Sequence, residues 1–135
     1  MRDMETYRVE PWSQLYPPNM ALLRQIMMEE GYAVHQWCDQ PEMEYGMHFH
    51  SEAQSHWIVS GSLELTVQNV GTFLLGPGDR DFMPANTYHS ARVIGEEAVI
   101  YLIGVRRKNA PLIFHRSIFV GSAVKLSNAI CFNAR

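Results

Sequence analysis

Residues 46–54 read Gly46-Met47-His48-Phe49-His50-Ser51-Glu52-Ala53-Gln54 and place two histidines one residue apart. In a β-strand, successive side chains point to opposite faces, so His48 and His50 would share a face while Phe49 points the other way. Two imidazoles on one face make half of a metal site. A third histidine, His89, ends the turn-rich stretch Pro84-Ala85-Asn86-Thr87-Tyr88-His89, and a small β-barrel would bring it to the same place.

The segments around this stretch have the period of two that is typical of strands. Leu63, Leu65 and Val67 alternate with other residues and would face one side together. Turn signals such as Ser60-Gly61-Ser62 and Gly76-Pro77-Gly78-Asp79 separate the segments. Short strands without intervening helices predict an all-β barrel or sandwich, with strands over residues 32–37, 45–50, 55–60, 63–68, 71–75, 90–94 and 98–105.

One helix is expected before these strands. Pro17-Pro18-Asn19 precedes residues 20–30, where apolar side chains recur at helical spacing, and Gly31 follows as a stop signal. A helix of about three turns is not stable alone in water, so it would pack against the barrel. We expect it to cover apolar surface, and a functional lid is the alternative.

Two motifs resemble those of the cupin superfamily. The run from His48 to Gln54, followed seven residues later by Gly61, resembles the first motif, and residues 78–89, Gly78 to His89, resemble the second. The resemblance covers about residues 38–106. It implies a double-stranded β-helical, or jelly-roll, barrel that forms homodimers. In that family two histidines and a glutamate of the first motif and a histidine of the second hold one divalent metal.

Three positions depart from the family pattern. Gln54 occupies the glutamate position and offers only a neutral carbonyl oxygen, which would weaken the binding of a hard cation. Asn86 replaces a glycine of the second motif, a mild change because asparagine tolerates positive φ. Glu42 lies where the family has an early glycine.

The resemblance assigns His48, His50 and His89 as metal ligands. Three neutral imidazoles suit Fe(II), Ni(II), Cu(II), Co(II) or Zn(II) and leave coordination positions open. We expect Gln54 as a weak or water-mediated fourth ligand, and Glu52 would substitute if its loop turned inward. The alternative to a metal site is a metal-free barrel in which the histidines hydrogen-bond one another or water.

His56 is the candidate catalytic residue. It shares strand parity with Gln54 and Ile58, so it would point into the barrel if Gln54 does. Two strand residues advance the chain by about 6.6 Å, so Gln54 and His56 should not both reach one ion. We therefore expect His56 in the pocket as a proton carrier rather than as a ligand.

Other conspicuous residues have structural interpretations. The aromatic residues Trp57, Phe73, Phe82 and Tyr101 are expected in the core. The charged turn Asp79-Arg80-Asp81 is expected to form surface ion pairs. Tyr88 is expected to pack or to lie at the rim of the site.

Composition limits the class of protein. The 135 residues are 47% hydrophobic and suffice for one domain with a substantial core. A net charge of −3 gives no basis for nucleic-acid binding, and no apolar run approaches a membrane span of about 20 residues. Cys38 and Cys131 are far apart, so a disulfide framework is not expected. We expect a soluble, cytoplasmic protein.

The chain is divided into three parts. Residues 1–37 form an N-terminal arm with the helix and the first strand, residues 38–108 form the barrel, and residues 109–135 form a tail of uncertain structure. The tail has no acidic residue but contains Arg116, Lys125 and Arg135, a shift in composition that marks the boundary.

The expected function is the binding of one divalent transition metal and a small organic ligand. Such a site could belong to a metal-dependent oxygenase, isomerase or lyase, with the metal as Lewis acid or oxygen-activating centre. The alternative is a non-catalytic binding or sensor module, with or without metal. The fold alone does not choose between them.

Overall fold

The structure is a computed structural model that describes residues 6–106. Its elements are β1 (Arg8–Glu10), α1 (Met20–Glu29), β2 (Ala33–Asp39), β3 (Glu44–His48), β4 (Ala53–Ser60), β5 (Ser62–Val67), β6 (Gly71–Leu75), β7 (Arg80–Phe82), β8 (His89–Ile94) and β9 (Val99–Arg106). The predicted tail, residues 109–135, lies outside the described residues. Within them, no helix is long and apolar enough to cross a membrane.

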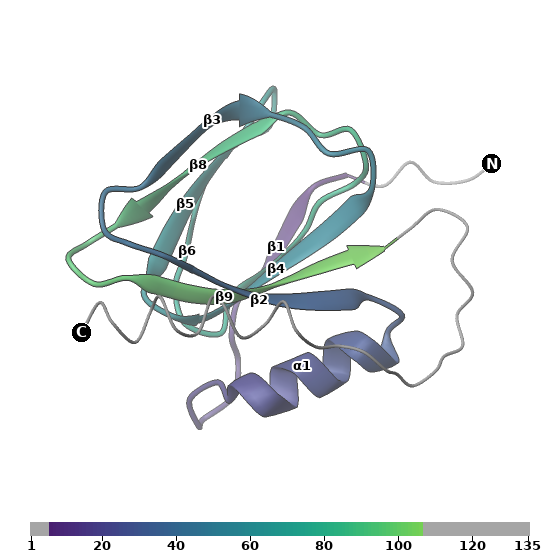
Figure 1. Ribbon diagram of the computed structural model, residues 1–135, viewed down its shortest axis with the longest axis vertical. Coiled ribbons are helices and arrows are strands. Elements are labelled where there is room, and N and C mark those ends of the chain that lie inside the picture. Colours follow the sequence, from purple (N-terminus) through teal and green to yellow (C-terminus); the bar gives the residue numbers. More distant parts are fainter. Residues whose placement is uncertain (1–5, 107–135) are drawn as a thin grey trace.

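The strands form two antiparallel sheets that face each other in a jelly-roll arrangement (Figure 1). The five-stranded sheet has the order β1-β7-β4-β9-β2, and the four-stranded sheet has the order β3-β8-β5-β6. β2 and β3 are consecutive in the chain, and each is one of the two edge strands of its sheet. This architecture confirms the predicted all-β fold with one N-terminal helix.

Seven of the nine strands correspond to predicted segments, with ends that differ by up to two residues. The strands that were missed, β1 and β7, have only three residues each and pair with one another. A segment this short shows no reliable alternation, so its pairing depends on partners distant in the sequence.

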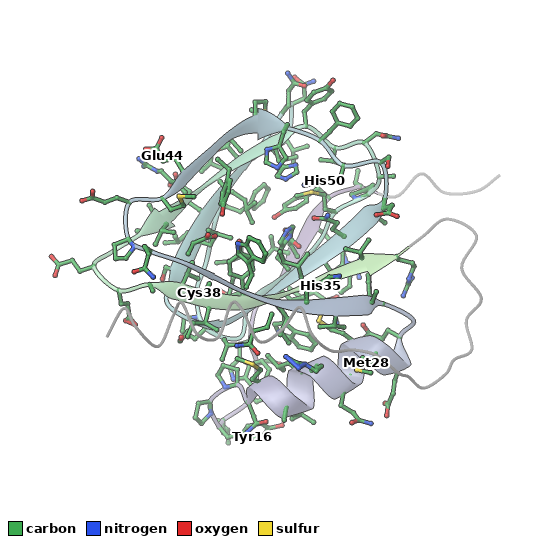
Figure 2. All side chains as sticks on the ribbon, viewed as in Figure 1. Tyr16, Met28, His35, Cys38, Glu44 and His50 are labelled. Atoms are coloured by element: carbon green, nitrogen blue, oxygen red, sulfur yellow. The ribbon has the colours of Figure 1, made fainter. Side chains whose placement is uncertain are left out.

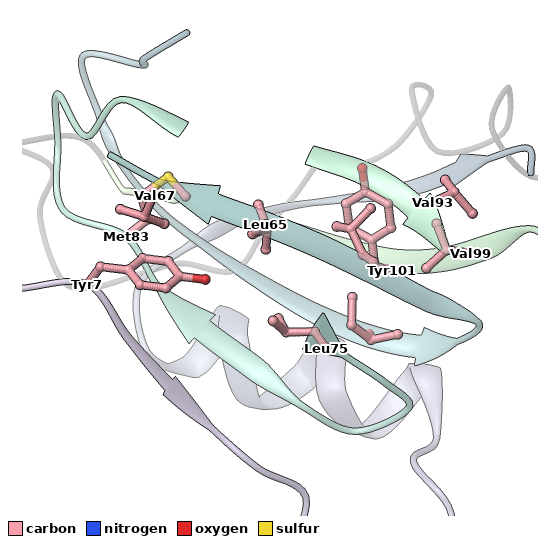
Figure 3. Packing of buried hydrophobic residues seen from close by; sticks show 10 residues of the cluster. Tyr7, Leu65, Val67, Leu75, Met83, Val93, Val99 and Tyr101 are labelled. Carbon is pink, nitrogen blue, oxygen red and sulfur yellow. The ribbon is translucent and has the colours of Figure 1, made fainter. Parts of the chain in front are cut away.

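The main core fills the space between the two sheets (Figure 3). Leu63, Leu65 and Val67 of β5 are buried, as their alternation predicts, with 1%, 1% and 2% of their surface exposed. Ile58 of β4 and Tyr101 of β9 meet them from the opposite sheet. Facing residues of the two sheets therefore hold the barrel together through apolar burial, about 25 cal/mol for each Å² removed from water.

The helix α1 covers the outer face of the five-stranded sheet, as predicted. Its N-terminus is capped by Asn19, whose side chain accepts a hydrogen bond from the Leu22 N–H. Leu23 and Met27 are fully buried in a second core cluster that also contains Trp57 and Leu102. The helix is therefore attached by its apolar stripe, and each buried side chain contributes about 1.5–3 kcal/mol.

Two departures from the family pattern have a backbone explanation. Asn86 has a φ of 65°, so it adopts the left-handed conformation expected for a residue in a glycine position. Glu42 has a φ of 73° and follows Pro41 in a turn closed by a hydrogen bond from the Met43 N–H to the Gln40 carbonyl. Such a turn normally has glycine at this place.

No disulfide was expected from the sequence, but Cys38 is disulfide-bonded. Among the described residues there is therefore no free cysteine. Cys131 lies outside the described residues.

Candidate metal site

Three imidazoles meet at one end of the space between the sheets. His48 ends β3 and is paired in register with His89, which begins β8. Between Tyr45 and His48 the register shifts, because three residues of β3 advance against two of β8. The bulge lets both Tyr45 and His48 face inward, although their odd spacing would place them on opposite faces of a regular strand.

His50 reaches the site from a loop and not from a strand. β3 ends at His48 and β4 begins at Ala53, so the expectation of one strand through His50 is wrong. The loop is held in place by its backbone, since the Asn86 N–H donates to the His50 carbonyl at 2.7 Å. Figure 2 shows the His50 side chain in the space between the sheets near β3. This hydrogen bond thus links the backbones of the two motifs beside the histidines.

The nitrogen atoms that could bind a metal lie within 4.8 Å of one another in His48, His50 and His89. Ligands bound at about 2.0–2.1 Å to one ion lie roughly 3 Å apart, so the rings would have to close slightly around a metal. The backbone fixes two of the rings. Nδ1 of His48 lies 2.6 Å from the Gly46 carbonyl, and Nδ1 of His89 lies 2.9 Å from the Thr87 carbonyl.

These contacts determine which ring nitrogen is available. A carbonyl oxygen only accepts hydrogen bonds, so Nδ1 must carry the hydrogen in His48 and His89. In the neutral ring the lone pair is then on Nε2, the atom that can bind a metal. A hydrogen bond from the other ring nitrogen to a backbone carbonyl is the usual support of a metal-binding histidine.

The surroundings keep two of the histidines neutral. Burial is the largest influence on the pKa of His89 and lowers it; the hydrogen bond to Thr87 raises it. The charges of the surrounding histidines lower it further, and the pKa of His89 is about 4. Burial, followed by the charges of His48 and His56, also lowers the pKa of His50. A neutral imidazole is the form that binds a metal.

Gln54 and Glu52 are the two further ligands that the sequence suggests. Gln54 is on the inner face of β4, because it has the parity of His56 and the core residue Ile58. Its role as a fourth ligand stays a prediction. Glu52 is half-buried, and its charge raises the pKa of His50. Among the described residues no carboxylate belongs to the three-histidine group.

A cavity of about 400 Å³ lies beside Glu52 and the start of β4. Glu52, Gln54 and Ala85 line it, together with Glu30 and Arg106. None of the three histidines is among its lining residues. The cavity is therefore not the metal site itself.

His56 is buried in the barrel, where the sequence places it, and Asp81 holds it. Asp81 is fully buried, and its Oδ1 accepts hydrogen bonds from the His56 backbone N–H at 2.7 Å and from Nδ1 at 3.0 Å. The Tyr7 hydroxyl donates to Oδ2 at 2.9 Å. Burial alone would lower the pKa of His56, but the charge of Asp81 and its hydrogen bond raise it.

The prediction of surface ion pairs in the charged turn is wrong. Arg80 and Asp81 are only 4% and 0% exposed. Arg80 lies on the outer face of the sheet, where it pairs with Glu30 at 2.6 Å and donates to the Ser55 hydroxyl at 2.8 Å. Adjacent residues of β7 thus serve opposite faces of the sheet.

A second buried carboxylate, Asp39, was not expected from the sequence. It accepts hydrogen bonds from the hydroxyls of Tyr45 at 2.6 Å and Tyr101 at 2.8 Å and from the Trp37 indole at 3.2 Å. Burial raises the pKa of both tyrosines, and Asp39 raises it further. No sequence motif marks this group, because its members come from three strands. Tyr101 and Trp57 are core residues as predicted.

Exposed aromatic rings lie beside the histidines. Phe49 and Tyr88 are 46% and 45% exposed, and their ring centroids are 4.8 Å apart. Tyr88 is therefore a rim residue, which is one of its two expected roles.

A family model described as Cupin domain matches residues 35–105 of the chain. The match contains all strands from β3 to β8 and the three histidines. A comparison with curated proteins gave no match.

Several solved structures are similar. DMSP lyase DddQ from Ruegeria pomeroyi DSS-3 is 22% identical with a TM-score of 0.53, over 59% of this chain and 40% of that chain. An uncharacterized conserved protein with a double-stranded β-helix domain from Klebsiella pneumoniae subsp. pneumoniae MGH 78578 is 26% identical with a TM-score of 0.51, over 61% and 72%. The Schizosaccharomyces pombe Cnp3 cupin domain is 26% identical with a TM-score of 0.50, over 56% and 53%. The likeness to the lyase, at 22% identity and 40% of its length, shows the fold alone.

Proposed function

The chain belongs to the cupin domain family, and we propose that its barrel binds one divalent transition metal through His48, His50 and His89. The observation that carries the proposal is the convergence of three imidazoles whose possible ligand atoms lie within 4.8 Å. Two of them have Nδ1 tied to a backbone carbonyl, which leaves Nε2 for a metal. Fe(II), Ni(II), Cu(II), Co(II) and Zn(II) all suit such a donor set.

Three neutral ligands leave the charge of a divalent ion uncompensated. The residue at the family's glutamate position is Gln54, so no carboxylate in the group of described ligands reduces that charge. Open coordination positions would therefore favour water or an oxygen atom of an anionic organic ligand. We propose a small organic anion as the ligand of this site.

His56 favours a reaction at this site over passive binding. Its Nδ1 lies 3.0 Å from an oxygen of the buried Asp81, so its orientation is fixed. Nε2, on the opposite side of the ring, is the nitrogen that we propose exchanges a proton with a bound ligand. A metal, when bound, would supply Lewis-acid or oxygen-activating chemistry. We propose His56 as the proton carrier of a metal-dependent enzyme.

Metal analysis tests the site. Purified protein equilibrated separately with Fe(II), Ni(II), Cu(II) and Zn(II) should retain close to one ion per chain after removal of free metal. His48→Ala, His50→Ala and His89→Ala should each reduce the retained metal, whereas His115→Ala, outside the described residues, should not. Protein that stays empty with all four metals would overturn the proposal. Circular dichroism of each variant separates metal loss from unfolding.

A further inference from the structure

We propose that Trp37, with His35 beside it, is the platform for the body of the ligand, a small organic anion with a flat apolar body whose anionic head is bound by the metal. This inference rests on the proposed function, and it adds the ligand class and the residues that hold the part of the ligand away from the metal.

Trp37 and His35 face the inside of the barrel, yet both are exposed. In the pairing of β2 with β9, Trp37 lies opposite Tyr101 and His35 lies opposite Ile103. Directly opposed residues of an antiparallel pair point to the same face, and Tyr101 and Ile103 belong to the core between the sheets. Nevertheless, Trp37 is 42% exposed and His35 is also exposed.

The reason for this exposure is the order of the strands. β2 pairs only with β9, and β3 pairs only with β8, among the described strands. β3 lies across from β2, since the Tyr45 hydroxyl bonds to Asp39, but β3 is an edge strand as well, so no further described strand extends either sheet beyond them. Figure 2 shows His35 on β2 and His50 on the opposite side of the same interior space. We infer that a small molecule enters toward the histidines along this exposed edge, where the side chains of Trp37 and His35 are exposed.

Hydrogen bonds hold the Trp37 ring in one orientation. Its Nε1 donates to Oδ1 of Asp39 at 3.2 Å, and the Tyr45 hydroxyl donates to the same oxygen at 2.6 Å. Asp39 is only 4% exposed and also accepts from Tyr101. An exposed indole normally loses side-chain freedom when a ligand binds, and here that freedom is already lost. The buried support distinguishes Trp37 from an ordinary exposed apolar residue.

The platform is continuous with the metal site. Tyr45, which shares the Asp39 oxygen with Trp37, lies in β3 on the inner face ahead of His48. On the opposite sheet, His56, Ile103 and His35 form one row across β4, β9 and β2. Neighbouring strands are about 4.8 Å apart, so His35 and His56 are separated by roughly 10 Å.

The charges decide the orientation of the ligand. A divalent ion held by three neutral imidazoles attracts the anionic head. Near Trp37 the carboxylate of Asp39 would repel an anion, although its oxygens are occupied by three donors. The flat face of the indole therefore receives the apolar body. Such aromatic contacts change affinity by about tenfold.

Benzoate and acetate test this inference, because they share the anionic head and differ in the body. Each is titrated into Zn(II)-loaded protein and followed by the indole N–H signals in ¹H–¹⁵N spectra, with Trp37→Phe to assign the Trp37 signal. We expect benzoate to bind about tenfold more tightly than acetate and to shift the Trp37 signal. Trp37→Ala should reduce benzoate affinity to that of acetate and leave acetate unchanged. Tyr16→Ala, which removes an exposed aromatic ring elsewhere, should preserve the difference.

The outcomes separate this inference from the proposed function. If Trp37→Ala binds zinc but still prefers benzoate as strongly as the unchanged protein, the platform is wrong and the metal site stands. If the protein retains no zinc, the titration of the metal-free protein decides the platform, and the proposed function fails only if Fe(II), Ni(II) and Cu(II) are not retained either. In that titration, a shift of the Trp37 signal with benzoate but not with acetate supports the platform. Equal shifts with both acids, or no shift with either, overturn it.

Discussion

At the scale of the residue, one side chain determines how much negative charge faces the metal. Replacing Gln54 with glutamate would restore the family carboxylate on the inner face of β4. Because a carboxylate adds charge and an anionic oxygen, we expect the metal affinity to rise by about 10 to 100-fold. Competition titration against a chelator measures this. Gln54→Ala is the control, and it should weaken metal binding or leave it unchanged. If the glutamate variant and the unchanged protein bind the metal equally well, position 54 does not reach the metal.

Glu42 is a second residue whose replacement should change a measurable quantity, the free energy of unfolding, in a known direction. Its φ of 73° costs a non-glycine residue about 1–2 kcal/mol, part of which the greater flexibility of unfolded glycine offsets. We expect Glu42→Gly to raise the free energy of unfolding by about 1 kcal/mol. Denaturant titration measures it. Glu42→Ala removes the same charge but keeps the strain, so it should be nearly neutral. Asn86→Gly should gain less, since asparagine tolerates this conformation.

At the scale of the element, Asp81 connects β7 to β4 through His56. The pKa of His56 is raised in the folded protein, so the folded state binds the proton more tightly than the unfolded state, where the ordinary value is 6.5. The stabilisation is fully present below pH 6.5 and is lost as pH rises through the folded pKa. The free energy of unfolding of the metal-free protein should therefore fall above pH 6.5.

Denaturant titration at pH 6, 7.5 and 9 measures this dependence. Asp81→Asn removes the charge that raises the pKa of His56, so the fall above pH 6.5 should disappear. Glu10→Gln, which changes an exposed carboxylate, should keep it. An unchanged slope in Asp81→Asn would show that His56 does not titrate against Asp81. The groups packed on His56 are Asp81 and Tyr101, and Tyr7 bonds to Asp81.

At the scale of the whole molecule, the two faces of the five-stranded sheet have different tasks. The outer face carries α1 and the ion pair of the buried Arg80 with the exposed Glu30. The inner face combines apolar packing toward β5 and β6 with the polar residues His56, Asp81 and Asp39. Buried polar groups of this kind are costly unless they are hydrogen-bonded, and here each carboxylate accepts at least three hydrogen bonds.

The sequence by itself determined those features that depend on neighbours along the chain. The helix follows from apolar spacing between Asn19 and Gly31, and the buried row of β5 follows from simple alternation. The resemblance of the two motifs to the cupin pattern predicted the barrel and the meeting of His48, His50 and His89. Strand alternation alone does not place these side chains, because His50 stands in a loop and a bulge orients His48.

Only the tertiary structure decided which polar residues are buried together. The contact of His56 with Asp81 joins residues 25 positions apart, and that of Tyr101 with Asp39 joins residues 62 positions apart. Local pattern indicates that a charged turn is polar, but burial depends on which strand lies opposite and in what register. The exposure of Trp37 also depends on the assembled sheets, since this inward-facing side chain lies on an edge strand. Strand order is a property of the assembled sheets, so no stretch of sequence contains it.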